Sequence, residues 1–189
     1  MEKLYIKNMM CKCCIPIVRN LLESNNIKVL FIKLGYAEVI FSENSPSFTE
    51  IDKTLQQVGF GLVISREKRI VEQTKLAVIE LIHFMNNVNS IVQKTDYLVE
   101  KLNLSYQQLS KLFSKYENTT LEKFIIQNKI ERIKELIDSD EFTLSEIAYM
   151  MDYSSVQYLS SQFKKETGIT VSEYKKDDRS ERIALEDLL

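Results

Sequence analysis

An internal repeat is the feature that most restricts how this 189-residue chain can fold. The segment 104–113 recurs as 153–163, and beyond it the two copies stay in register at a spacing of 50 residues. The matched pairs are Leu109 and Leu159, Ser110 and Ser160, Phe113 and Phe163, Lys115 and Lys165, and Thr120 and Thr170, with Phe124 and Tyr174 closing the copies. Such a repeat is typical of one structural unit used twice. We therefore expect two copies of a helical unit, joined by a long helix over 120–137.

Within each copy the sequence predicts a short helix, a tight turn and a second helix that begins at a serine. In the second copy, Thr143-Leu144-Ser145-Glu146 has the capping-box pattern that begins a helix. A small residue, Ala148, then lets the short helix approach its neighbour closely. The short helices and turns are marked by Leu98, Val99 and Leu102 before 103–105, and by Ile147, Ala148 and Met151 before 152–154. This is the pattern of a helix-turn-helix unit, whose second helix enters the major groove of DNA.

The second helix of each unit has an apolar face and a polar face. The side chains expected to face inward are Leu109, Leu112, Phe113, Leu159 and Phe163. The opposite face then carries side chains that reach base edges and phosphates. The predicted DNA-binding residues are Tyr106, Gln107, Ser110 and Lys111 in the first copy, and Val156, Gln157, Ser160, Ser161 and Lys164 in the second.

Residues 75–176 resemble the DNA-binding domain of AraC-type transcription regulators. The matching segments are 144–148, 153–155, 163–170 and 172–174 in the second copy, and 109–113 with 129–133 in the first. The resemblance implies that the two second helices enter successive major grooves, with centres about 34–36 Å apart. Ser161 stands where this family usually carries arginine, and Val171 where it usually carries proline.

The charge balance argues against DNA binding. The formal net charge is −2, and residues 96–176 hold 11 Lys and Arg against 13 Asp and Glu. The phosphate backbone favours a basic surface. Binding is therefore expected to be weak, to require a homodimer or to be confined to few sequences. One alternative is a protein-interaction adaptor whose helix-turn-helix units no longer read DNA.

The first 65 residues alternate predicted strands with predicted helices. The strands are expected around 4–6, over 27–34 and 36–41 on either side of Gly35, and over 62–64; the helices are expected over 15–22 and from Ser47 to Gly59. This βαββαβ order is the ferredoxin-like arrangement. The expected fold class is α+β, with a small ferredoxin-like domain over 1–65 and an all-α tandem helix-turn-helix domain over 91–176.

A helix over 66–90, ending near Asn86-Asn87, is expected to link the two domains, either as a packed linker or as a homodimer seam. A polar tail covers 177–189. His83, the only histidine, is expected to serve packing or to lie at the surface. With one histidine and no glycine-rich phosphate loop, we expect no enzyme. No apolar run approaches the roughly 20 residues that span a bilayer, so no membrane association is expected.

The three cysteines, Cys11, Cys13 and Cys14, lie between the first predicted strand and the first predicted helix. Cys11 and Cys14 are separated by two residues, so both sulfurs can point at one centre. The start of the helix and the neighbouring Lys12 favour the thiolate of Cys14. Soft thiolates suit Cu(I), Zn or another soft metal ion, with a further ligand from Cys13 or from a second chain. The clustering predicts free thiols in a reducing, cytoplasmic compartment.

Residues 1–65 resemble the heavy-metal-associated domain of copper chaperones and metal pumps. The Met-x-Cys-x-x-Cys pattern falls at Met9, Cys11 and Cys14, and Asn8 stands where the family usually has glycine. The resemblance implies that Cys11 and Cys14 are metal ligands. The alternative is a metal-binding fold reused for dimerisation or for a small effector, with cysteines that are inert or redox-active.

Together these patterns predict a cytoplasmic, sequence-specific transcription regulator that binds double-stranded DNA. Its N-terminal domain is expected to respond to a soft metal ion. A metal-trafficking protein is the alternative from another class, but it does not account for the helical repeat.

Overall fold

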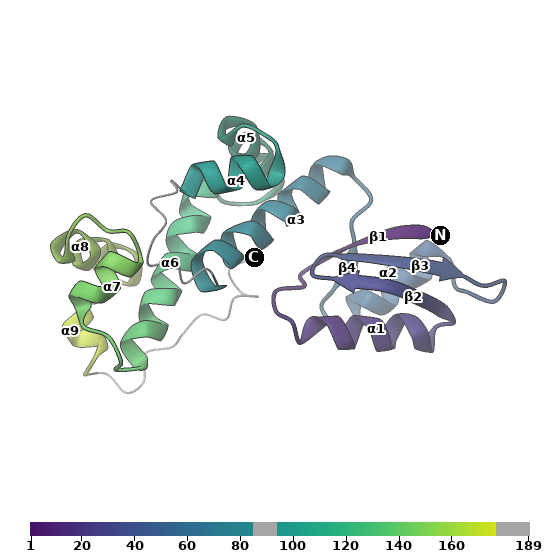
Figure 1. Ribbon diagram of the computed structural model, residues 1–189, viewed down its shortest axis with the longest axis horizontal. Helices are drawn as coiled ribbons and strands as arrows, with labels where there is room; N and C mark the ends of the chain where they lie inside the picture. The colour runs from purple at the N-terminus through teal and green to yellow at the C-terminus, as the bar shows by residue number, and fades with distance from the viewer. Residues whose placement is uncertain (85–93, 177–189) are drawn as a thin grey trace.

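Residues 1–84 and 94–176 are described by a computed structural model, in which a small sheet with two helices precedes a helical body (Figure 1). The sheet contains β1 (Glu2–Lys7), β2 (Ile27–Lys33), β3 (Tyr36–Phe41) and β4 (Gly61–Leu62). Its strands are antiparallel and lie in the order β2-β3-β1-β4. Helices α1 (Cys14–Ser24) and α2 (Phe48–Gln56) follow β1 and β3, which gives the predicted βαββαβ order.

Alternation along the strands separates the two faces of the sheet. Leu4 and Ile6 of β1 are buried with Val18 and Leu22 of α1 in one apolar cluster. Tyr5, between them in sequence, therefore lies on the opposite face. The sheet thus has one face covered by α1 and α2, and a second face lined by the alternate side chains.

The turn that leads from β1 to the cysteines requires a left-handed residue. Asn8 has φ +66° there, and its side-chain amide donates to the carbonyl of Gly59 at 2.9 Å. Asparagine adopts this conformation more readily than most residues. Asn8 is therefore suited to this turn by its backbone conformation and by its side-chain hydrogen bond.

The helical body begins with α3 (Arg66–Ile79), which continues into a π-helical turn, η1 (Glu80–Phe84). The remaining helices are α4 (Lys94–Leu102), α5 (Tyr106–Tyr116), α6 (Leu121–Asp138), α7 (Leu144–Met150), α8 (Val156–Thr167) and α9 (Val171–Tyr174). Residues from α3 to α9 form one buried cluster. The predicted linker helix is therefore packed into the helical body, through Val71, Ala77 and Val78 of α3.

The repeat is visible in the backbone. Asn103 and Asp152 both take left-handed φ values, +52° and +56°, in the turns before α5 and α8. They are 49 residues apart, whereas the later pair Leu109 and Leu159 is 50 apart. The extra residue of the second copy thus lies between the turn and the first buried leucine of the second helix.

Several sequence predictions are confirmed by the described residues. The long joining helix is α6, capped by the Thr120 hydroxyl, and the capping box at Thr143 and Glu146 is formed. The last strand is shorter than expected, because β4 covers only Gly61–Leu62 and Ile64 is exposed. The predicted helix end at 86–87 and the tail at 177–189 lie outside the described residues.

The close approach of α7 to its neighbours depends on Ala148, which is 3% exposed. Replacing it with leucine forces extra methyl groups into a packed core, so we expect Ala148→Leu to lower the free energy of unfolding by about 1–3 kcal/mol. Ser145→Leu, at an exposed position of the same helix, is the matched control. Urea unfolding of the three proteins is the measurement, and equal stability of the two variants would contradict close packing at Ala148.

Candidate functional site

Helices α5 and α8 are positioned by the same combination of a serine cap and two buried side chains. Ser105 and Ser155 accept hydrogen bonds from the backbone three residues into each helix. The fully buried residues are Leu109 and Phe113 in α5, and Leu159 and Phe163 in α8. Each helix is therefore held by one face, as the repeat predicted, and its other face is turned outward.

The predicted DNA-binding residues divide by exposure. The exposed ones are Gln107 and Lys111 on α5, and Gln157, Ser161 and Lys164 on α8. Tyr106, Ser110, Val156 and Ser160 are partly buried. Tyr106 packs against the apolar core, and burial is the main cause that raises its pKa above the usual value. Tyr106 and Val156 thus also stabilise the helix position.

The charge objection is weaker when these helices are considered separately. Between them α5 and α8 carry four lysines and a single carboxylate, Glu166. The joining helix α6 is neutral, because its four carboxylates are matched by four basic residues, so the acidic excess lies in the shorter helices and the connecting segments. The outward helices are therefore basic although the domain as a whole is not.

Two exposed aromatic residues beside this surface were not predicted from the sequence. Tyr149 of α7 is 67% exposed and Tyr158 of α8 is 56% exposed. The Tyr158 ring lies 5.7 Å from that of Tyr153, measured between centroids. Tyr149 directly follows the buried Ala148, and Tyr158 directly precedes the buried Leu159. An aromatic residue next to a predicted inward-facing position could have identified both as exposed.

A buried polar contact joins the end of the α3 segment to α6. His83 is 8% exposed, which assigns it to packing rather than to the surface. Its Nδ1 lies 3.6 Å from Oε2 of Glu135, and Nη1 of Arg132 lies 2.7 Å from the same oxygen. His83 is the largest cause and Arg132 a further cause that lower the pKa of Glu135 to about 2.

The cysteine loop differs from the predicted set of free thiols. Cys11 and Cys13 form a disulfide, and Cys14 is free and buried at the start of α1. The sulfurs of Cys11 and Cys14 lie 3.6 Å apart, and all three sulfurs are within 4.8 Å of one another. The expectation of three free thiols is therefore wrong for this state, because the tight loop brings the sulfurs of Cys11 and Cys13 within bonding reach.

The structure also places Met9 of the cysteine motif. Met9 is fully buried in the apolar cluster of the sheet and α1. Its side chain therefore anchors the loop, while Cys11 and Cys13 remain partly or fully exposed.

Comparison with known proteins matches the helix-turn-helix part of the chain. Residues 98–177 match the family model described as a helix-turn-helix domain. The xylose operon regulatory protein of Escherichia coli strain K12 is 31% identical over 124 residues, which cover 64% of this chain and 32% of that protein. Residues 98–177 belong to a helix-turn-helix domain.

Other proteins similar to this chain are also named as regulators. The Msm operon regulatory protein of Streptococcus mutans is 26% identical over 101 residues, covering 50% of this chain and 36% of that protein. A solved transcriptional regulator with an AraC-type DNA-binding domain, from Chromobacterium violaceum, is 20% identical with a TM-score of 0.47, covering 57% of this chain and 94% of that one. The chain spans about a third of the length of the curated relatives.

Within the described residues, no helix is long and apolar enough to cross a membrane.

The contact at Glu135 predicts an acid-dependent loss of stability in the helical body. Because the folded-state pKa lies below the usual value of 4.5, the ionised form stabilises the fold above that pH. This stabilisation is lost as the pH falls from about 4.5 through about 2. We expect Glu135→Gln to be less stable than the wild type at neutral pH and to lose less stability over this acid range.

Urea unfolding at several pH values measures this difference. Glu141→Gln, which removes an exposed carboxylate without an ion pair among the described residues, is the matched control. If the free energy of unfolding changed with pH in the same way for the wild type and Glu135→Gln, the ionised Glu135 would not stabilise the fold.

Proposed function

We propose that this protein is a cytoplasmic, sequence-specific transcription regulator of the AraC type, whose helices α5 and α8 read double-stranded DNA. The observation that carries the proposal is the repeated unit itself. Each copy holds a capped helix by two buried residues and turns a polar, basic face outward. The similarity to operon regulatory proteins supports the same function.

The exposed residues of α5 and α8 are of two kinds, glutamines suited to contact bases and lysines suited to contact phosphates. Gln107 and Gln157 are exposed near the start of their helices, where side chains meet base edges in a helix-turn-helix complex. A glutamine amide pairs with both hydrogen-bonding groups of adenine in the major groove. Lys111, about one turn after Gln107, and Lys164, about two turns after Gln157, supply charge for phosphates.

Selection from a random-sequence duplex library tests the function directly. We expect the recovered sequences to share two half-motifs about one helical turn apart, because α5 and α8 belong to one chain. Binding at increasing protein concentration also tests the predicted homodimer. Recovery of no shared motif would contradict sequence reading and leave an adaptor or a metal carrier as the function.

Ser161 offers a gain-of-function test. Its hydroxyl donates to the carbonyl of Gln157 within α8, and the side chain is exposed. Arginine at this position adds a phosphate-binding charge without displacing a core contact. We expect Ser161→Arg to bind DNA more tightly and to steepen the dependence of log affinity on log salt by about one.

Asn20→Arg is the matched control, because it adds the same charge at an exposed position of α1, remote from the helical body. Fluorescence anisotropy with a labelled duplex at several salt concentrations measures both variants. An equal gain in DNA affinity for Ser161→Arg and Asn20→Arg would show a general effect of added charge. It would contradict the proposal that α8 lies on the DNA.

We further propose that the N-terminal region is a ferredoxin-like domain of the heavy-metal-associated type that receives a soft metal ion. The donor set fits such an ion, since the three sulfurs lie within 4.8 Å of one another. The disulfide between Cys11 and Cys13 must first be reduced, because thiolates are the metal ligands. Cys11, Cys13 and Cys14 would then hold Cu(I), Zn or a similar ion.

The metal proposal predicts a redox-dependent uptake of Cu(I). We expect the reduced protein to bind one Cu(I) against a competing chelator, and the oxidised protein to bind none. Cys11→Ser and Cys14→Ser should abolish uptake, and Cys13→Ser should weaken it. Met9→Leu preserves the buried volume and is the control that should bind as the wild type does. Uptake that persists in Cys11→Ser would contradict the site.

A further inference from the structure

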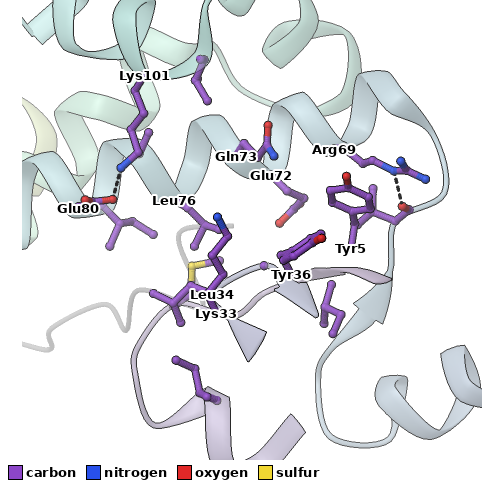
Figure 2. A pocket seen from close by; sticks show the side chains of 18 of the residues that line it. Tyr5, Lys33, Leu34, Tyr36, Arg69, Glu72, Gln73, Leu76, Glu80 and Lys101 are labelled. Carbon is purple, nitrogen blue, oxygen red and sulfur yellow. Dashed lines mark hydrogen bonds and ion pairs between the residues drawn. The ribbon is translucent and has the colours of Figure 1, made fainter. Parts of the chain in front are cut away.

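A cleft of about 950 Å³ lies between the second face of the sheet and α3 (Figure 2). Its floor is formed by the strand residues that alternation turns away from α1 and α2. Its roof is formed by α3, from which Glu72 and Leu76 point toward the sheet (Figure 2). The volume lies within the range typical of small-molecule sites.

The floor of the cleft is aromatic. Tyr5 of β1 is the direct cross-strand partner of Tyr36 in β3, and their ring centroids are 5.4 Å apart. Phe31 of β2 extends this surface, with its centroid 6.4 Å from that of Tyr36. Arg69 of α3 covers one end, where its guanidinium lies 4.1 Å from the centroid of Tyr5. Aromatic side chains on the face of a sheet are suited to stacking against flat rings.

The residues that line the cleft carry more positive than negative charge. Glu72 and Glu80 are each paired with a lysine amine, that of Lys75 at 3.2 Å and that of Lys101. Glu38 accepts a hydrogen bond of 2.6 Å from the neutral Tyr36 hydroxyl and keeps its negative charge, but the lysines of the lining outnumber it. Lys3, Lys12 and Lys33 line the cleft and form no ion pair with any residue that the structure describes. The amine of Lys33 lies 5.6 Å from the centroid of the Tyr36 ring, so charge and ring adjoin.

We propose that this cleft binds a flat aromatic anion. The ring packs against Tyr5 and Tyr36, and the anionic group pairs with Lys33, while Lys3 and Lys12 add positive charge. An aromatic carboxylate and a mononucleotide share this chemistry.

The position of the cleft suggests that its ligand acts on the regulator as a second signal, in addition to the metal ion. This role rests on the proposed function. Its roof, α3, also contributes Val71 and Val78 to the core that holds α5. Its rim includes Met10 and Lys12 of the cysteine loop. A bound ligand therefore contacts the cysteine loop, the sheet and the helix that supports the first reading helix.

Naphthalene-2-carboxylate is the probe, and its neutral amide is the matched compound without the charge. The chain has no tryptophan, so the fluorescence of the probe can be excited without competing protein emission. We expect one molecule of the carboxylate to bind per chain in the absence of DNA. The amide should bind about tenfold more weakly, because it loses a charged hydrogen bond.

Variants locate the bound probe. Lys33→Gln should weaken the carboxylate by about tenfold without changing the affinity of the amide. Tyr36→Leu should weaken both compounds. Lys53→Gln, on the exposed surface of α2, is the control that should leave both affinities unchanged. Thermal unfolding of each variant verifies that it is folded.

Displacement of the probe by adenosine 5′-monophosphate would assign the mononucleotide class, and its failure would assign the aromatic acids. Absence of one-to-one binding, equal affinity for acid and amide, or unchanged affinity in Lys33→Gln and Tyr36→Leu would each overturn the proposal. Because the titration contains no DNA, its outcome is independent of whether α5 and α8 read DNA.

Discussion

The arrangement of both halves depends on α3, which is packed on two sides. One side contributes Val71 and Val78 to the core of the helical body. Lys75, only 4% exposed, strengthens this side by pairing with Glu117 at 2.8 Å, just after α5. The other side faces the sheet, where Arg69 lies over the Tyr5 ring and Leu76 approaches the turn between β2 and β3. A helix with two such faces cannot move relative to one half without disturbing contacts with the other.

That constraint gives a physical route between the N-terminal region and the first reading helix. α3 packs against α5, and Glu67 near the start of α3 pairs with Lys115 of α5. Gly35 supports the contact with the sheet, because a side chain there would meet the Leu76 methyl group at 2.7 Å and would also need the left-handed φ of +73°. The cysteine loop and the cleft both adjoin this contact, so the two proposed ligands would act on the same helix.

The charged residues of α6 and those of α5 and α8 have different surroundings. In α6 the carboxylate of Glu131 pairs with Lys134, and Glu135 pairs with Arg132. These pairs lie within α6 itself, at a spacing of three residues, and their side chains are largely shielded from solvent. On α5 and α8, by contrast, Lys111, Lys164 and Lys165 are exposed. A net charge summed over the domain hides this separation, because only the outward charges meet a phosphate backbone.

The sequence by itself determined the features that depend on neighbouring residues. The repeat, the capping box at Thr143, the inward faces of α5 and α8 and the βαββαβ order follow from local spacing and hydrogen bonding, and they were predictable for that reason. The tertiary structure decided the disulfide between Cys11 and Cys13, the contact between His83 and Glu135, and the cleft between Tyr36 and α3. The last two join residues far apart in the chain, and the disulfide depends on which pair of sulfurs the folded loop brings together. Periodicity and spacing carry no information about such distances.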